Sequence, residues 1–329
     1  MPREFTAESI YGIARNFMEC RLFLTGVELN LYSLVSSSPL SAEEIAGELK
    51  SDLRATTYLL DALSALGFLE KGKGRYRTAP SAAPFLSESE PTSILPGLMH
   101  TAHLWQTWSQ LTDVVRNGGP AKRDTPGYKD DRLTAFIGAM HVGAAGAADG
   151  IVEAITPGSA RALIDVGGGS GSYSIAFLNA SPEMKATLFD LPPVIEMARK
   201  RVGDSGLLDR VTLVPGNFYK DTLPAGHDLA LLSAIIHQNS DDQNRALYKK
   251  VFDALDSGGR IIVRDHVMEP DRTRPVSGAI FAINMLVNTP GGGTYTFEEI
   301  KEGLNEAGFE RVRQLQSQRM FSLVEAFKP

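Results

Sequence analysis

Cysteine is almost absent from this chain of 329 residues, which contains Cys20 and no other thiol. One cysteine excludes an intramolecular disulfide and a Cys-x-x-Cys metal site. A surplus of positive charge is missing as well, because 33 Lys and Arg are outnumbered by 39 Asp and Glu, which gives a net charge of −6. Proteins that coat nucleic acid need a basic surface to meet the phosphates, so this composition argues against that class.

Long apolar runs are also missing. No stretch of 18 apolar residues occurs, and the first residues, MPREFTAESIYG, show no basic segment followed by an apolar one. We therefore expect no membrane-spanning helix, no signal peptide, no membrane partner and a cytoplasmic location. A hydrophobic fraction of 43% is ordinary for a globular protein, and the length predicts about two domains.

Residues 1–98 are predicted to form helices followed by a small hairpin. A helix is expected over Thr6–Ser33, and Ser41 with Glu44 three positions later forms a capping box that starts another. A further helix is expected over 52–67, and the glycine-containing turn within 68–78 favours a hairpin. This order of elements is typical of a winged helix-turn-helix.

The winged-helix pattern serves either DNA binding or packing between protein chains. Residues 1–90 contain nine Lys and Arg against twelve Asp and Glu, and the expected recognition helix offers Arg54 alone to the phosphates. This acidic balance favours a packing or dimerisation module over DNA binding. A ligand-sensing DNA-binding regulator remains the alternative from a different functional class.

Residues 99–155 are predicted to be a helical connector that contributes to a substrate pocket. Two histidines and two tryptophans cluster within 100–108, and a long helix rich in Ala and Gly is expected over Leu133–Ile155. His100 and His103 share a helix face, but no third ligand follows at the spacing of a metal motif. We expect no metal.

Residues 156–329 alternate between apolar runs and helical segments, which predicts a parallel sheet covered on both faces. The runs are Ala162–Val166, Ala186–Leu191, Val211–Val214, Leu229–Leu232 and Arg260–Val263. The expected helices are Gly171–Ala180, Pro193–Val202, Asp241–Leu255 and Phe297–Ala307. Phe309–Leu315 and Ser322–Phe327 are expected to close the sheet as an antiparallel hairpin. The predicted fold class is α/β, with a Rossmann-like doubly wound sheet after an N-terminal winged-helix domain.

A glycine loop follows the first strand of this sheet. The strand and loop read Asp165-Val166-Gly167-Gly168-Gly169-Ser170-Gly171, and ligands bind at such positions in doubly wound sheets. A dinucleotide fingerprint starting at Gly167 would need a glycine at position 172, where serine stands. This spacing argues against a nicotinamide oxidoreductase. The Asp165 carboxylate suits an ammonium group better than a pyrophosphate.

The next two strands end in residues suited to a nucleoside. Asp190, followed by Leu191, lies where an acidic side chain accepts hydrogen bonds from a ribose diol. Asn217 and Phe218 follow the third strand, and an amide beside an aromatic ring suits an adenine.

These segments resemble the S-adenosylmethionine-dependent O-methyltransferases of the caffeate and hydroxyindole type. The resemblance covers nearly the whole chain, including the N-terminal module, which serves homodimerisation in that family. It is carried by Leu163–Gly171, Phe189–Pro192, Gly216–Tyr219, Leu231–His237 and Met285–Gly292.

The resemblance implies a role for each matching residue. S-adenosylmethionine would be bound by Asp165, Gly167, Gly169, Asp190, Leu191, Asn217, Phe218 and Ser233, with S-adenosylhomocysteine as the product. His237 would be the general base, and Asp265 would orient it. Met140, Met285, Asn288 and Thr289 would contact the acceptor. Gln238 and Thr294 depart from the family pattern, which usually has acidic residues there.

The expected activity is O-methylation of a small aromatic hydroxyl compound of secondary metabolism by a homodimer with no nucleic-acid partner. C- or N-methylation on the same scaffold remains an alternative, since the donor site would be the same.

Overall fold

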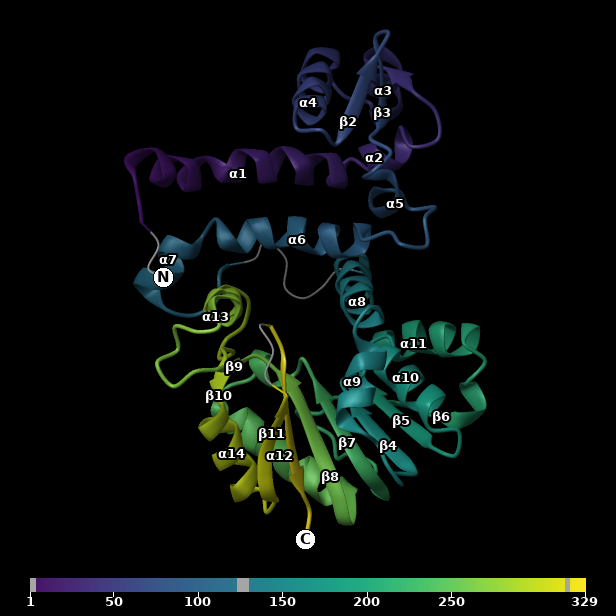
Figure 1. Cartoon of the computed structure of the whole chain (residues 1–329), viewed down its shortest axis with the longest axis vertical. Coiled ribbons are helices and arrows are strands. Elements are labelled where there is room, and N and C mark those ends of the chain that lie inside the picture. The colour runs from purple at the N-terminus through teal and green to yellow at the C-terminus, as the bar shows by residue number, and fades with distance from the viewer. Residues whose placement is uncertain (1–3, 123–129, 317–319) are drawn as a thin grey trace. The chain divides into compact units, whose positions relative to one another are not determined.

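The computed structural model describes residues 4–122, 130–316 and 320–329. The chain divides into two compact units (Figure 1). The first comprises Met1–Trp105 and Tyr128–Ala139, and the second comprises Gln106–Gly127 and Met140–Pro329. The division into 1–98, 99–155 and 156–329 stays a prediction.

The first unit is built from short helices and a small sheet around one apolar core. Its elements are α1 (Ala7–Glu28), α2 (Leu31–Leu34), β1 (Leu40–Ser41), α3 (Ala42–Leu49), α4 (Leu53–Ala65), β2 (Leu69–Gly72), β3 (Arg75–Thr78) and α5 (Ala83–Leu86). Two further helices, α6 (Leu95–Trp108) and α8 (Asp130–Ala145), cross the boundary between the units. The predicted capping box is present, because Ser41 accepts from the Glu44 amide and Glu44 from the Ser41 amide. The predicted hairpin is the antiparallel pair β2–β3.

Two predicted helices are too long. The helix expected over Thr6–Ser33 ends at Glu28, and Asn30 adopts a left-handed conformation (φ 49°) before α2 begins. The break places Leu31 and Tyr32 in the core, where each is 0% exposed. The helix expected over Leu133–Ile155 is likewise divided into α8 and α9 (Ala148–Ile155).

The second unit contains a seven-stranded sheet. Its strands are β4 (Ala162–Val166), β5 (Lys185–Asp190), β6 (Val211–Pro215), β7 (His227–Ser233), β8 (Leu255–Asp265), β11 (Glu310–Gln316) and β12 (Ser322–Phe327). The order is β11-β12-β8-β7-β4-β5-β6, with β4 to β8 parallel and β12 antiparallel to both of its neighbours. The doubly wound sheet and its antiparallel closing hairpin are confirmed.

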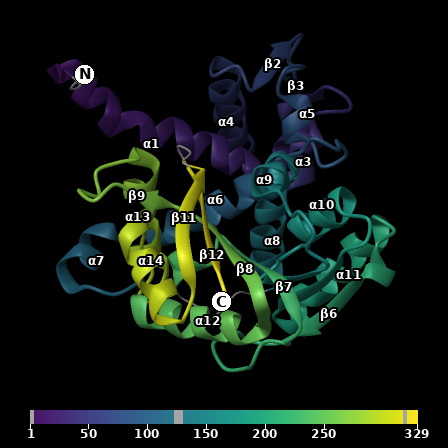
Figure 2. The same ribbon diagram turned by 60° about the horizontal axis from the view of Figure 1, so that its bottom comes forward.

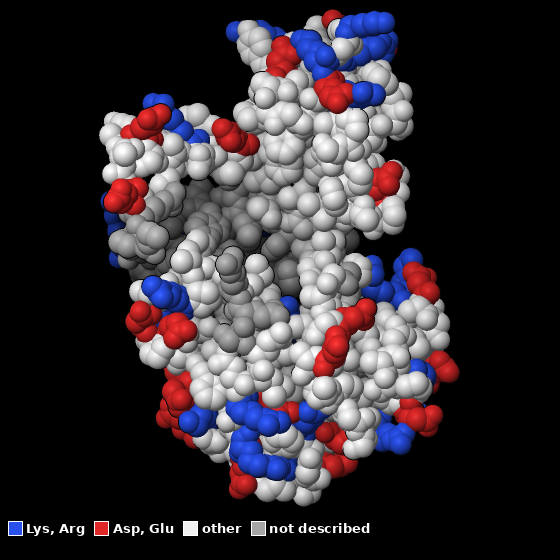
Figure 3. Space-filling model, viewed as in Figure 1, with Lys and Arg blue, Asp and Glu red and all other residues white. Residues whose placement is uncertain are grey.

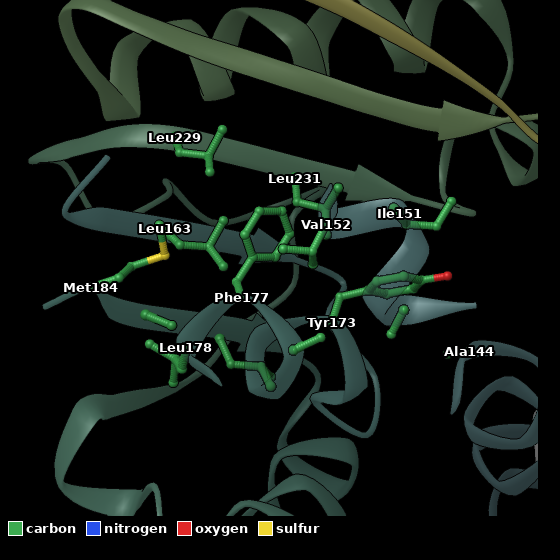
Figure 4. Packing of buried hydrophobic residues seen from close by; sticks show 14 of the residues in the cluster. Ala144, Ile151, Val152, Leu163, Tyr173, Phe177, Leu178, Met184, Leu229 and Leu231 are labelled. Carbon is green, nitrogen blue, oxygen red and sulfur yellow. The ribbon is translucent and has the colours of Figure 1, made fainter. Parts of the chain in front are cut away.

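Helices cover both faces of the sheet (Figures 1 and 2). They are α10 (Ser172–Ala180), α11 (Pro192–Asp204), α12 (Asp241–Ala254) and α14 (Phe297–Glu306), with α7 (Leu111–Asn117) and α13 (Val276–Asn288) outside these layers. One core joins α9, α10 and α11 to the sheet, and a second joins α12 and α14. Figure 4 shows the first core, in which Phe177 packs among Leu163, Val152 and Leu231.

Helix α13 is a difference from the prediction, which assigned no helix to its residues. It packs against the segment around α7: Val114, Ala121 and Val287 form a small apolar cluster, and Trp108 Nε1 donates to Asn284 Oδ1 at 2.9 Å. Two-residue strands β9 (Val267–Met268) and β10 (Tyr295–Thr296) pair beside it. Within the described residues, no single helix is long and apolar enough to cross a membrane. The two helices Arg132–Ala144 and Ala148–Ile155, which form a bent pair, meet that criterion when they are counted together, by length and composition only.

Candidate active site

The glycine loop and Asp190 meet at the carboxyl ends of β4 and β5. The Gly169 amide donates to Asp190 Oδ2 at 2.8 Å, and the Leu191 amide donates to Asp190 Oδ1 at 2.7 Å. Burial raises the pKa of Asp190, while these two amide bonds lower it by less. The Leu191 side chain is 44% exposed beside this carboxylate. The structure therefore brings together the two motifs predicted to bind a nucleoside.

Two positions in the loop require glycine for different reasons. Gly167 has φ 70°, and a Cβ there would overlap Ile235 Cδ1. A Cβ at Gly168 would lie 2.8 Å from Asp165 Cγ, directly above that carboxyl group. The loop backbone thus passes so close to its neighbours that no side chain can intervene.

Asp165 lies beneath the loop and is 1% exposed. Ser174 Oγ donates to Asp165 Oδ2 at 2.7 Å, and burial raises the Asp165 pKa to about 6 against the smaller lowering effect of that bond. The carboxyl group therefore supports the loop and the start of α10 from below. Its contact with a donor ammonium stays a prediction.

Asn217 and Phe218 stand beyond β6, next to the loop. Asn217 Oδ1 accepts from the Tyr219 amide at 2.9 Å, which leaves its side-chain amide hydrogens outside this turn. A Cβ at Gly167 would lie 3.6 Å from Phe218 Cε1, so the Phe218 ring borders the loop.

His237 and Asp265 form a hydrogen-bonded pair. His237 lies on the short 3-10 helix Ile236–Gln238 after β7, and Asp265 ends β8. Nδ1 of His237 and Oδ1 of Asp265 are 2.8 Å apart, and the two side chains are 13% and 1% exposed. An ionised carboxylate only accepts, so Nδ1 carries the proton and Nε2 is the nitrogen left to accept one.

The electrostatics of this pair favour a charged carboxylate. Burial alone would raise the pKa of Asp265, but the interactions with His237 and the amide of His266 outweigh it and hold that pKa below its usual value. A buried anion that stays ionised fixes the ring tautomer and stabilises a proton arriving at Nε2.

The departures Gln238 and Thr294 lie in two segments: Gln238 ends the 3-10 helix that carries His237, and Thr294 precedes β10. The Gly293 amide donates to the His237 carbonyl at 2.8 Å. Thr294 is buried and uncharged, and its carbonyl accepts from Arg272 Nη1 at 2.8 Å. Among the described residues, Asp265 is the carboxylate that contacts the His237 ring.

Two aromatic rings that the sequence did not reveal, Phe281 and Phe321, lie near His237 and its neighbour His266. The Phe281 ring on α13 lies 4.8 Å from the His237 ring at 86°, and it stacks on His266 at 4.2 Å. Phe321 covers His266 from another direction, with ring centroids 4.6 Å apart. The adjacency of His266 to Asp265 was the one sequence signal available for this group.

Of the predicted acceptor-side residues, three gather at the end of α13. Met285 is 7% exposed, Thr289 Oγ1 donates to the Met285 carbonyl at 2.8 Å, and Asn288 Nδ2 donates to the Asn284 carbonyl at 2.8 Å. Met140 lies on α8 and is 39% exposed. No contact recorded among the described residues joins it to α13.

Family models match both parts of the chain. The O-methyltransferase domain model covers residues 108–310, and the O-methyltransferase dimerisation domain model covers residues 11–88. The chain belongs to the O-methyltransferase family. The predicted S-adenosylmethionine-dependent methyltransferase class is confirmed, and the winged-helix module is the dimerisation domain of this family.

Similar proteins differ in the atom that their names give as methylated. The chain is 30% identical to 3-hydroxy-5-methyl-1-naphthoate 3-O-methyltransferase of Streptomyces sahachiroi, over 92% of this chain and 89% of that one. It is 28% identical to L-tyrosine C(3)-methyltransferase of Streptomyces lavendulae, over 86% and 81%. The solved structure of PigF with SAH matches with a TM-score of 0.90 and 25% identity, over 98% and 100% of the two chains.

Proposed function

We propose that this methyltransferase transfers the methyl group of S-adenosylmethionine to a hydroxyl of a small aromatic compound, with His237 as the general base. The observation that carries the proposal is the 2.8 Å contact between His237 Nδ1 and the buried Asp265. That pair lies at the same carboxyl edge of the sheet as the glycine loop, where doubly wound folds bind ligands.

The residues of this edge fit the donor. Gly167 and Gly169 would hold the methionine portion, since a Cβ at Gly167 is sterically excluded. Each Asp190 carboxylate oxygen accepts one backbone hydrogen bond and keeps a further lone pair, with which it would bind the ribose hydroxyls. Leu191 would lie beside the ribose. Asn217 and Phe218 would hold the adenine. When bound, S-adenosylmethionine supplies an electrophilic methyl carbon.

The surroundings of His237 support an aromatic acceptor. Phe281 presents its ring near the imidazole, and Met285, whose thioether is polarisable, is buried on the same helix. Asn288 and Thr289 end that helix, and Met140 is the proposed contact from α8. The naphthoate named for the Streptomyces sahachiroi relative is an aromatic hydroxy compound of this kind.

His237 would take the acceptor proton on Nε2 as the methyl group arrives. A free imidazole has a pKa of about 6.5 and a phenol about 10, a gap of ~3.5 units or ~5 kcal/mol. Removing the proton before transfer would therefore be costly for an ordinary phenol. Proton loss during transfer, with Asp265 stabilising the imidazolium, avoids this cost.

Labelled S-adenosylmethionine incubated with a panel of phenols, quinols and amines tests the proposal. We expect label to enter a phenol oxygen, and His237→Ala to lower kcat by about 100-fold or more while the dissociation constant of S-adenosylhomocysteine stays within twofold. Unchanged turnover in His237→Ala would show that the assigned base is wrong. Label on carbon or nitrogen in the wild-type product would identify the C- or N-methylation alternative.

The predicted assembly follows from the dimerisation domain. We propose a homodimer formed through the first unit, in which α1 exposes Ile10, Tyr11, Ile13, Phe17 and Met18. Basic side chains gather at the hairpin β2–β3, but Lys71, Arg75 and Arg77 are paired with Asp61, Glu44 and Glu70, and Figure 3 shows both signs of charge in this region. This mixture is unlike the basic stripe of a DNA-binding surface. Metal independence stays a prediction, tested by assaying activity after EDTA treatment.

A further inference from the structure

Arg264 is a buried arginine on the strand that also carries Asp265. It precedes Asp265 on β8, is 7% exposed, and pairs in register with Ser233 at the end of β7. Side chains alternate along a strand, so Arg264 faces the side of Ile262, whereas Asp265 faces the opposite side with Val263. No hydrogen bond or ion pair recorded among the described residues joins Arg264 to the pair formed by Asp265 and His237.

The guanidinium of Arg264 has few partners. Nη1 donates to Ser233 Oγ at 3.3 Å, and the buried Nε has no hydrogen-bond partner among the residues that the structure describes. The rings of Phe321 and Tyr173 lie 4.0 Å and 5.3 Å from the guanidinium carbon. No ion pair recorded in the described part of the chain involves Arg264. Rings cover the faces of a guanidinium, but its five N–H donors point outward in its plane and need acceptors.

Other shielded arginines of the same unit are satisfied by the protein. Arg260, four residues earlier on β8, pairs with the buried Glu325 and donates to the Thr156 carbonyl at 2.7 Å. Arg210 donates to the carbonyls of Leu178, Ser181 and Met184. Burying a guanidinium without hydrogen-bond acceptors costs free energy. A bound ligand that supplies the acceptors would explain why an arginine is buried at position 264.

A second buried donor lies next to Arg264. The Tyr173 hydroxyl is buried and makes no hydrogen bond of normal geometry within residues 4–122, 130–316 and 320–329. Burial raises the Tyr173 pKa, and Arg264 and Ser233 lower it by less. Figure 4 shows this hydroxyl pointing away from Phe177 and Leu163, out of the apolar core. Tyr173 follows Gly171 by two residues at the start of α10. Ser233, Arg264 and Tyr173 thus present hydrogen-bond donors at the edge of the sheet where the glycine loop ends.

We propose that Arg264, with Ser233 and Tyr173, forms a carboxylate-binding subsite next to the glycine loop. A guanidinium matches the two oxygens of a carboxylate, and the anion neutralises the buried positive charge. The subsite rests on the proposed function, because the carboxylate comes either from the methionine portion of the donor or from the acceptor. The position of Tyr173, directly after the loop, favours the donor.

Calorimetry with matched ligand pairs tests this subsite in the full-length protein. S-adenosylhomocysteine is compared with its decarboxylated analogue, and 4-hydroxybenzoate with 4-hydroxybenzamide in the presence of S-adenosylhomocysteine. We expect the wild type to prefer the carboxylate member of at least one pair by about 10- to 100-fold, and Arg264→Met to abolish that preference. The pair affected identifies the source of the carboxylate.

A control and a second variant separate binding from folding. Arg260→Met removes an arginine that faces the same side of β8, and it should leave the preference intact. Arg264→Lys keeps a positive charge but lacks the planar guanidinium, and it should retain part of the preference for the carboxylate ligand. This variant replaces Arg264→Met in the test if Arg264→Met does not fold.

Three results overturn the subsite. The first is a wild type that binds both members of both pairs equally. The second is an Arg264→Met variant that keeps the preference, and the third is one that weakens carboxylate and neutral ligands alike. If Arg264→Met binds S-adenosylhomocysteine and still prefers it over the decarboxylated analogue as strongly as the wild type does, the subsite is refuted and the proposed function is unaffected. Failure of the wild type to bind S-adenosylhomocysteine would refute both.

Discussion

His237 and Asp265 have separate roles in the proposed proton transfer. Asp265, which is 1% exposed, accepts the Nδ1–H hydrogen bond of His237 and leaves Nε2 outside the pair, and the Phe281 ring lies 4.8 Å from the imidazole. Because interactions with His237 keep the pKa of Asp265 below its usual value, the carboxylate is charged throughout the neutral pH range. Its charge is therefore available to stabilise the imidazolium formed during methyl transfer.

Replacing this charge by an amide tests the division of roles. Asp265→Asn keeps the size of the side chain but removes the anion and allows the other ring tautomer, so kcat should fall by about 100-fold or more. The affinity for S-adenosylhomocysteine, measured by calorimetry, should stay within twofold because Asp265 is outside the proposed donor contacts. An equal loss of donor affinity would show that Asp265 supports the whole edge rather than the base.

Asp165 gives a prediction about stability and pH. Its folded-state pKa of about 6 exceeds its ordinary value of 3.8, so the folded protein binds the proton more tightly than the unfolded chain. The carboxyl group therefore becomes destabilising as the pH rises from 4 through 6, and the cost is fully present above that range. Asp165→Asn should be more stable than the wild type at pH 8, and this gain should be about 2 kcal/mol smaller at pH 4.5.

Urea unfolding of both proteins at the two pH values measures this gain, since other titrating groups cancel in the difference. A gain that does not change with pH would contradict the account of the buried carboxyl group.

Among the elements, the glycine loop carries the most specific prediction. Gly167→Ala places a methyl group on a backbone with φ 70° and against Ile235. We expect S-adenosylhomocysteine binding to weaken at least tenfold and the unfolding free energy to fall by about 1–3 kcal/mol. Gly150→Ala on α9, where a Cβ meets no atom within 4 Å, is the matched control and should change neither quantity unfavourably. Normal binding by Gly167→Ala would show that the loop does not hold the donor.

The sequence predicts the central strands β4, β5 and β7 well because they are largely buried and read as nearly continuous apolar runs. Helix α13 escapes prediction for a related reason: its apolar stretch has no polar face to reveal a helical period. The breaks at Asn30 and between α8 and α9 depend on tertiary packing, which overrides local helix propensity.

In the candidate site too, some residues can be predicted from the sequence and others depend on tertiary contacts. Residues at strand ends, such as Asp190 and Asp265, are recognisable from position and chemistry. Phe281, Phe321 and Arg264 are not, because their importance arises from contacts between segments far apart in the chain.

At the scale of the whole molecule, the dimerisation domain predicts the oligomeric state. Phe17 on α1 is 52% exposed in the single chain, and a homodimer would cover such apolar side chains. Phe17→Glu combined with Ile13→Glu should shift the mass measured by light scattering from a dimer toward a monomer of 35.6 kDa. Val115→Glu, which replaces a 67% exposed apolar residue on α7, should leave the mass unchanged. A dimer that survives both α1 substitutions would place the interface elsewhere.

The central claim is that the edge formed by the glycine loop, Asp190 and Asn217 binds an S-adenosyl nucleoside. Calorimetric titration of the wild-type protein with S-adenosylhomocysteine and, separately, with NADH tests it most directly. The account predicts saturable binding of S-adenosylhomocysteine at one site per chain and no binding heat with NADH. Saturable binding of NADH, with none for S-adenosylhomocysteine, would contradict it.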